Sequence, residues 1–194
     1  MKPPSWAAAR RPLMKQSAIP VHTLTLTALM AAMLCVLGPL SIPIGPVPLS
    51  LATLVIYLSV YLLGWKWGLV SVVVYLLVGM SGVPVFSGFG GGIGRLLGPT
   101  GGYLIGYLPL AALSGLGVQH SSRRCLHLLA MAFGTVALYA LGTAWYCFEA
   151  GTTLGAAMAK CVWIFIPGDL IKMAIAIFVG PVLHERLTQA NILK

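Results

Sequence analysis

Long apolar runs alternate with short segments rich in proline, glycine or charge along almost the whole chain. Each run holds about 16 to 23 residues, enough for a helix to cross about 30 Å of hydrocarbon. The pattern predicts an all-α integral membrane protein whose six transmembrane helices pack in one bundle. The predicted helices cover residues 22–40, 48–63, 66–82, 100–118, 125–147 and 166–186.

The composition supports this interpretation and excludes an ordinary soluble domain. Hydrophobic residues make up 59% of the 194 residues, charged residues only 8%, and the mean hydropathy is +0.96. A soluble domain carries about a quarter charged residues and has too little interior for so much apolar surface. We therefore predict one membrane domain over residues 22–187, between cytoplasmic tails at 1–21 and 188–194.

The net charge of +9 indicates membrane orientation and not nucleic-acid binding, because no strip of interleaved aromatic and basic residues is present. With the amino terminus in the cytoplasm, nine of the twelve Lys and Arg residues fall on cytoplasmic segments, as the positive-inside rule expects. An even number of spans then places both termini in the cytoplasm. The connections 38–48 and 83–100 come to lie on the outer side.

Both of these outer connections are unsuited to a helix. Four prolines fall between Pro39 and Pro48, where they restrict the backbone and remove N–H donors. The segment 83–100 is rich in glycine. Irregular backbone at membrane depth is tolerated only beside protein or a water-filled cavity. We therefore expect segment 83–100 to form a mobile lid over a cavity.

Asp169 stands out among the three acids of the chain. It falls in the first turn of the last predicted helix, where Pro167 suits the start of a helix and the helix dipole favours an acid. Lys172 follows at i+3 on the same face. Charges within spans usually face a bundle interior and mark a ligand or ion pathway. The alternative is that the two side chains only neutralise each other near the outer interface.

Arg95 adds a third charge on the same side of the membrane, within the predicted lid. Together with Asp169 and Lys172 it leaves a local charge of +1. Such a site suits a ligand that has one carboxylate and further neutral polar groups.

No pattern in the chain indicates a metal or a catalytic centre. The four cysteines include no CxxC pair, and the four histidines show neither HxxxH nor HExxH spacing. Neither a GxSxG sequence nor a Walker A sequence is present. We expect a protein that is not an enzyme and that needs no cofactor of its own.

Three segments together resemble the biotin-specific substrate-capture (S) components of energy-coupling factor (ECF) transporters, the BioY family. They read IPIGPVPL at Ile42–Leu49, then GVPVF at Gly82–Phe86 through LGPTGGYLIGY at Leu97–Tyr107, and FIPGDLIK at Phe165–Lys172. The resemblance covers nearly the whole chain after about residue 22. It implies a bacterial or archaeal plasma-membrane protein that binds biotin at its outer face. Its implied partners are a transmembrane T component and two ATPase subunits, which hydrolyse the ATP.

The resemblance also implies a set of ligand-binding residues. Asp169 and Lys172 match the polar biotin contacts of the family, with Arg95 as a further one. The biotin carboxylate would pair with Lys172, with Arg95 as an additional candidate, while Asp169 would accept from a ureido N–H or orient Lys172. Residues of the lid and of the helix that follows it would line the pocket, with two outer aromatic residues as further candidates: Phe86, Gly98, Thr100, Gly101, Gly102, Tyr103, Trp145 and Tyr146.

The first predicted helix offers a surface for the T component. Ala28 and Ala32 form a small-xxx-small pair with Ala31 beside them, and S components resemble one another in packing such alanines on the T component. Packing within the same bundle is the alternative. An S component for another small vitamin and an intramembrane enzyme stay open as rival functions, and so does self-association.

Overall fold

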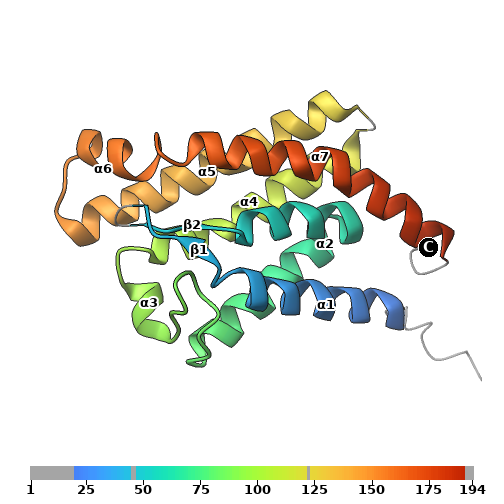
Figure 1. Cartoon of the computed structure of the whole chain (residues 1–194), viewed down its shortest axis with the longest axis horizontal. Helices are drawn as coiled ribbons and strands as arrows, with labels where there is room; N and C mark the ends of the chain where they lie inside the picture. The colour runs from blue at the N-terminus through green and yellow to red at the C-terminus, as the bar shows by residue number, and fades with distance from the viewer. Residues whose placement is uncertain (1–19, 45–46, 122, 191–194) are drawn as a thin grey trace, which may run out of the picture.

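The computed structural model describes residues 20–44, 47–121 and 123–190, which form seven helices and two short strands (Figure 1). The predicted tails at 1–21 and 188–194 lie mostly outside these residues. In chain order the elements are α1 (Val21–Leu37), β1 (Ser41–Ile42), β2 (Leu49–Ser50), α2 (Ala52–Met80), α3 (Ile93–Leu97), α4 (Gly101–His120), α5 (Arg124–Ala150), α6 (Leu154–Cys161) and α7 (Ile166–Gln189).

The helices follow the predicted spans closely, and the all-α fold class is confirmed. Four helices, α2, α4, α5 and α7, are long and apolar enough to cross a membrane, and α1 is a shorter apolar helix. Three elements were not predicted from the sequence. They are the β1–β2 hairpin in the proline-rich connection, α3 within segment 83–100, and α6 between α5 and α7.

The helix α2 covers the second and third predicted spans and reverses direction at Gly64. Gly64 has φ 72° and ψ −179°, a conformation that is essentially restricted to glycine. A Cβ built on Gly68 would lie 3.2 Å from the Cα of Val60, although eight residues of straight helix would separate the two by about 12 Å. The two halves of α2 therefore fold back on each other.

The reversal frees a backbone carbonyl, and α7 satisfies it. Tyr61 would accept a hydrogen bond from the fourth residue onward in a continuous helix, but the turn at Gly64 interrupts the ladder. His184 of α7 lies 3.1 Å from the Tyr61 carbonyl through Nδ1 and donates to it. The Tyr61 hydroxyl lies 3.0 Å from Nδ1 of the buried His127 on α5. Tyr61 thus joins α2, α5 and α7.

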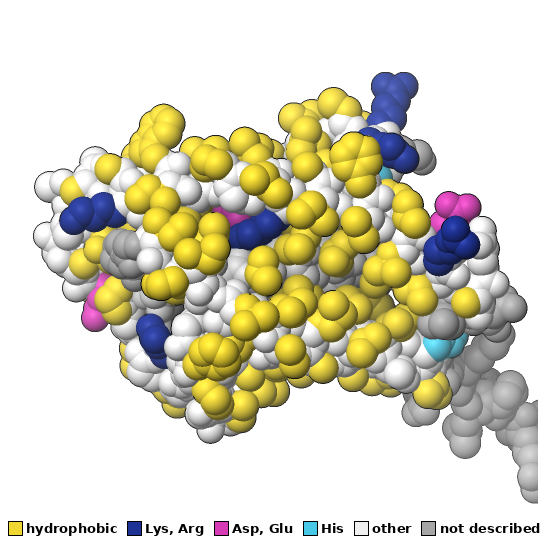
Figure 2. All heavy atoms as spheres, in the orientation of Figure 1, with side chains coloured by type: hydrophobic (Ala, Val, Ile, Leu, Met, Phe, Trp, Pro, Cys, Tyr) yellow, Lys and Arg dark blue, Asp and Glu magenta, His cyan; other side chains and the backbone are white. Residues whose placement is uncertain are grey.

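The two ends of the bundle differ in structure. One end, which we call the hairpin end, carries β1–β2, α3 and α6; at the other, the terminal end, α1 begins and α7 ends (Figure 1). Hydrophobic side chains cover most of the flank between the two ends, and one acidic and one basic group are visible side by side in its middle (Figure 2). Large exposed residues such as Phe133, Phe148 and Phe178 suit contact with lipid.

The hairpin end is held together by hydrogen bonds from Ser50 and by packing of the lid, the segment 83–100. The Ser50 hydroxyl donates to the Gly38 carbonyl at 2.7 Å and accepts from the Ala52 N–H at 3.0 Å, so it ties the hairpin to the end of α1 and satisfies the first backbone N–H of α2. Phe86 of the lid is almost fully buried, with its ring packed edge-on against Tyr75 of α2. These contacts place the hairpin and the lid over the same end of the bundle.

The reversal at Gly64 leads to a testable prediction. The substitution Gly64→Ala should destabilise the protein by about 1–3 kcal/mol, because alanine would be strained at this φ and ψ. No steric clash contributes, since the nearest atom to the added Cβ is the Gln119 side-chain oxygen at 3.8 Å. Thermal unfolding in detergent measures the effect. Gly94→Ala is the matched control, with ordinary φ and open space around it, and an equal loss in both variants would contradict the prediction.

Candidate functional site

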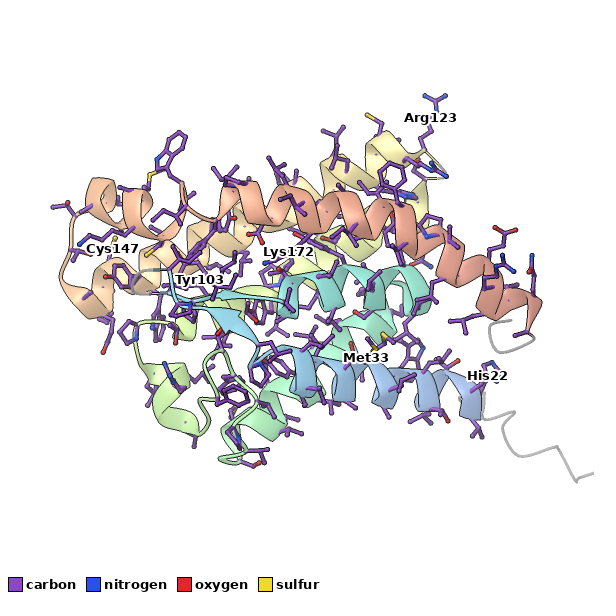
Figure 3. All side chains as sticks on the ribbon, in the orientation of Figure 1. His22, Met33, Tyr103, Arg123, Cys147 and Lys172 are labelled. Atoms are coloured by element: carbon purple, nitrogen blue, oxygen red, sulfur yellow. The ribbon has the colours of Figure 1, made fainter. Side chains whose placement is uncertain are left out.

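A cavity lies at the hairpin end, between the hairpin, the lid and helices α2, α4 and α7. Its free volume is about 50 Å³, room for a few water molecules. Figure 3 shows Lys172 of α7 and Tyr103 of α4 close to the hairpin. Six of the residues predicted to bind a ligand line this cavity: Phe86, Arg95, Thr100, Tyr103, Asp169 and Lys172.

Asp169 and Lys172 form a buried ion pair inside the bundle. Asp169 is 3% exposed and Lys172 is 6% exposed, and the Lys172 ammonium lies 3.0 Å from Oδ1 of Asp169. Asp169 sits in the first turn of α7, where the positive end of the helix dipole stabilises its charge. The pair therefore faces the bundle interior, where the two side chains neutralise each other.

All three N–H donors of Lys172 have partners within the protein. Besides Asp169, the ammonium donates to the Ser50 carbonyl at 2.6 Å and to the Thr53 hydroxyl at 3.1 Å. A buried charge is stable only when it is paired and hydrogen-bonded in this way. Lys172 thus ties α7 to the hairpin and to the first turn of α2.

Asp169 is equally well satisfied. Its Oδ1 accepts from Lys172 and, at 3.4 Å, from the Thr53 hydroxyl, and its Oδ2 accepts from the Tyr139 hydroxyl of α5. Neither Thr53 nor Tyr139 was predicted from the sequence. Both residue types are common in membrane helices, and only the packing of α2 and α5 against α7 reveals that these two face the acid.

Arg95 differs from Lys172 in its surroundings. It lies on α3 with an exposed side chain that lines the cavity and packs against Gly90. Across the ranges that the structure describes, the one ion pair between Lys or Arg and an acid is Asp169–Lys172. The cavity therefore combines an internally neutralised pair with the net positive charge of Arg95.

The other predicted ligand residues lie close to the cavity without lining it. Trp145 donates from Nε1 to the Gly98 carbonyl at 3.0 Å, and a Cβ built on Gly102 would lie 2.3 Å from the Trp145 Cβ. These residues hold the end of the lid against α4 and α5. The cavity lining leaves out Gly98, Gly101, Gly102, Trp145 and Tyr146.

The three alanines of α1 do not share one environment. Ala28 and Ala32 are exposed, whereas Ala31 is 4% exposed and packs within the bundle. The exposed pair is the part of this surface that another protein can reach.

Comparison with known proteins shows which family the chain resembles. The sequence profile of the BioY family matches residues 11–189. The chain belongs to the BioY family. The resemblance carried by the hairpin, lid and α7 segments is therefore confirmed, and with it the membrane location of the chain.

Several BioY relatives match over most of their length. The "Probable biotin transporter BioY" of Pyrococcus horikoshii is 36% identical over 156 residues, which cover 80% of this chain and 92% of the relative. The "Biotin transporter BioY" of Rhodobacter capsulatus is 38% identical over 170 residues, 79% of this chain and 88% of the relative. Because the relatives are named as transporters, the expectation that the chain is not an enzyme is confirmed.

A solved structure matches the fold as well. A crystal structure described as the "S-component for biotin from an ECF-type ABC transporter" aligns with a TM-score of 0.78 at 34% sequence identity. The alignment covers 85% of this chain and 92% of that chain. The chain therefore has the S-component architecture.

The buried pair predicts an asymmetry between single and double substitutions. Lys172→Met should destabilise the protein by about 3–5 kcal/mol, because it leaves the Asp169 carboxylate buried without its counter-charge. The double variant Asp169→Asn/Lys172→Met removes both charges and should lose less than half as much. Thermal unfolding in detergent compares the two. A double variant that is as unstable as Lys172→Met would show that the unpaired charge is not the cause.

Proposed function

We propose that this chain captures biotin at the hairpin end and passes it inward with an ATP-driven coupling module. The buried Asp169–Lys172 pair at the wall of a cavity is the observation that carries the proposal. Maintaining such a pair inside a membrane protein is costly, and it is characteristic of a ligand or ion pathway. The names of the BioY relatives and of the structural neighbour support biotin as the ligand.

The chemistry of the cavity suits biotin. Biotin has an apolar fused ring system, a ureido group with N–H donors and a carbonyl acceptor, and a valerate tail that ends in a carboxylate. Small-molecule sites of this kind are mostly apolar with a few directed polar groups. Phe86, Tyr103 and Leu104 supply apolar walls, and Asp169 and Thr53 supply polar groups at one side. The ureido N–H would donate to Asp169.

The carboxylate of biotin would pair with Arg95. The donors of Lys172 are already taken by Asp169, Thr53 and the Ser50 carbonyl, so a ligand carboxylate would have to displace one of them. Arg95 lines the same cavity and has no acidic partner among the described residues. A guanidinium also matches a carboxylate through two parallel hydrogen bonds.

Binding would require the hairpin and the lid to move. A free volume of about 50 Å³ is far below the 300–1,000 Å³ that is typical of ligand pockets. A hydrogen bond of 3.1 Å from the Gly88 N–H to the Pro39 carbonyl ties the lid to the connection just before β1, so the lid and the hairpin would open together. Their closure would then exclude water from the ligand.

The proposed membrane topology has six crossings. They are α1, the two halves of α2, α4, α5 and α7, and the reversal at Gly64 supports counting α2 twice. With both termini in the cytoplasm, the hairpin end faces outward. The T component and two ATPase subunits would drive release toward the cytoplasm, with the exposed Ala28 and Ala32 of α1 as the contact for the T component.

Binding of biotin to the purified protein tests the ligand and the role of Arg95 together. We expect tight binding of labelled biotin that unlabelled biotin displaces and other vitamins do not. Arg95→Ala should weaken biotin binding by about 1.5 kcal/mol, roughly tenfold, through the loss of one charged hydrogen-bond partner. Biotinamide, which lacks the carboxylate charge, should bind Arg95→Ala as well as it binds the unsubstituted protein.

Lys172, the other basic residue that lines the cavity, provides the control for this experiment. Lys172→Ala should weaken the binding of biotin and of biotinamide by similar factors, because Lys172 holds Asp169 and the hairpin in place and does not contact the biotin carboxylate. Displacement of labelled biotin by another vitamin at equal concentration would favour an S component for that vitamin. An equal loss of affinity for biotin and for biotinamide in Arg95→Ala would show that the biotin carboxylate binds to another residue.

The proposed surface on α1 makes a separate prediction. Ala28→Leu and Ala32→Leu should reduce co-purification of the T component and ATPases while leaving biotin binding intact, because a larger side chain prevents close helix contact. Ala174→Leu on the exposed side of α7 is the matched control. If all three variants retain the partners equally, the contact lies on another surface.

A further inference from the structure

Tyr139 contacts Asp169 from outside the cavity. Its hydroxyl donates to Oδ2 of Asp169, yet Tyr139 does not belong to the cavity lining. It lies instead in a groove between α5, α6 and α7 that also reaches Asp169 and has a volume of about 580 Å³. Asp169 lines both spaces, so it forms part of the wall between them.

The groove is almost entirely apolar. Val136 and Ala140 of α5, Met158 of α6 and Leu170 of α7 are among its walls. The neighbouring faces of α5 and α7 expose large hydrophobic side chains, which places the groove on the lipid-facing flank. A carboxylate that borders such a surface without a hydrogen-bond donor is strongly disfavoured.

Tyr139 is the polar side chain that protects the carboxylate on this side. The two threonines that also line the groove have other partners: Thr135 lies 2.6 Å from the Tyr57 hydroxyl, and Thr143 lies 3.2 Å from the Tyr103 hydroxyl. Among the described residues, the hydrogen bond to Oδ2 comes from Tyr139 alone, while Lys172 and Thr53 both bond to Oδ1.

We propose that Tyr139 is a positioning residue for ligand recognition, and this inference rests on the proposed binding of biotin. By holding Oδ2 on the groove side, Tyr139 sets the rotation of the carboxylate. Oδ1 then stays with Lys172 and Thr53, which occupy both of its lone pairs, and Oδ2 keeps its second lone pair for an N–H of the ligand. Without the phenol, Oδ2 would compete for Lys172 or Thr53, and the acceptor offered to the ligand would turn away.

A double-mutant cycle on biotin affinity tests the inference. Tyr139→Phe removes one oxygen and should weaken biotin binding about tenfold in the otherwise unsubstituted protein. On the Asp169→Asn background the same substitution should change affinity less than twofold, because the carboxylate on which it acts is gone. Tyr57→Phe is the matched control. It removes a buried hydroxyl whose partner Thr135 keeps its bond to the Met131 carbonyl, and it should have less than a twofold effect in both backgrounds.

Further readouts separate positioning from general structural damage. Biotin and biotinamide should lose affinity by the same factor in Tyr139→Phe, because Tyr139 acts on the acid and not on the carboxylate contact. If Tyr139→Phe does not fold, Tyr139→Gln, which keeps a donor, should bind biotin more tightly than Tyr139→Leu, which has none.

Distinct results would overturn this inference and the function on which it rests. Equal losses from Tyr139→Phe in both backgrounds, no loss at all, or equal affinities of the Gln and Leu variants would reject the positioning role while leaving biotin as the ligand. Failure of the unsubstituted protein to bind biotin would reject the proposed function and the positioning role together.

Discussion

An ion pair at the start of α7 is the constraint around which the hairpin end is organised. Neither Asp169 nor Lys172 is stable in an apolar interior unless each polar atom has a partner, and three separate elements supply those partners. The Ser50 carbonyl comes from the hairpin, the Thr53 hydroxyl from α2 and the Tyr139 hydroxyl from α5. Satisfying one pair of charges therefore fixes how α2, α5 and α7 approach one another.

This arrangement also divides electrostatic roles within the cavity. The pair cancels its own charge over a distance of 3.0 Å, and it can remain buried whether or not a ligand is present. The exposed guanidinium of Arg95 on α3 then gives the cavity its positive potential. A ligand with a single negative charge and a neutral hydrogen-bonding head group complements both features, and biotin as the cargo of BioY transporters fits that description.

The sequence predicted the helices and the charged residues of the site but not the contacts between them. Hydropathy locates membrane helices well because the bilayer imposes one length and excludes unpaired backbone. Asp169 and Lys172 were identified because charge within an apolar run is rare. Thr53 and Tyr139 were missed because nothing local distinguishes them; their role depends on which faces of α2 and α5 turn toward α7. The hairpin, α3 and α6 are short, and their stability comes from tertiary contacts that no periodic pattern records.

The attachment of α7 at two points limits how this protein can move. Near its beginning Lys172 binds α2 and the hairpin, and near its end His184 binds the carbonyl released by the turn at Gly64. Because α7 is attached at both points, it cannot slide along α2 without breaking the hydrogen bonds of Lys172 and of His184. A movement that shifts α7 against α2 therefore has to break both attachments, whereas a movement of the two helices together as one rigid body keeps both.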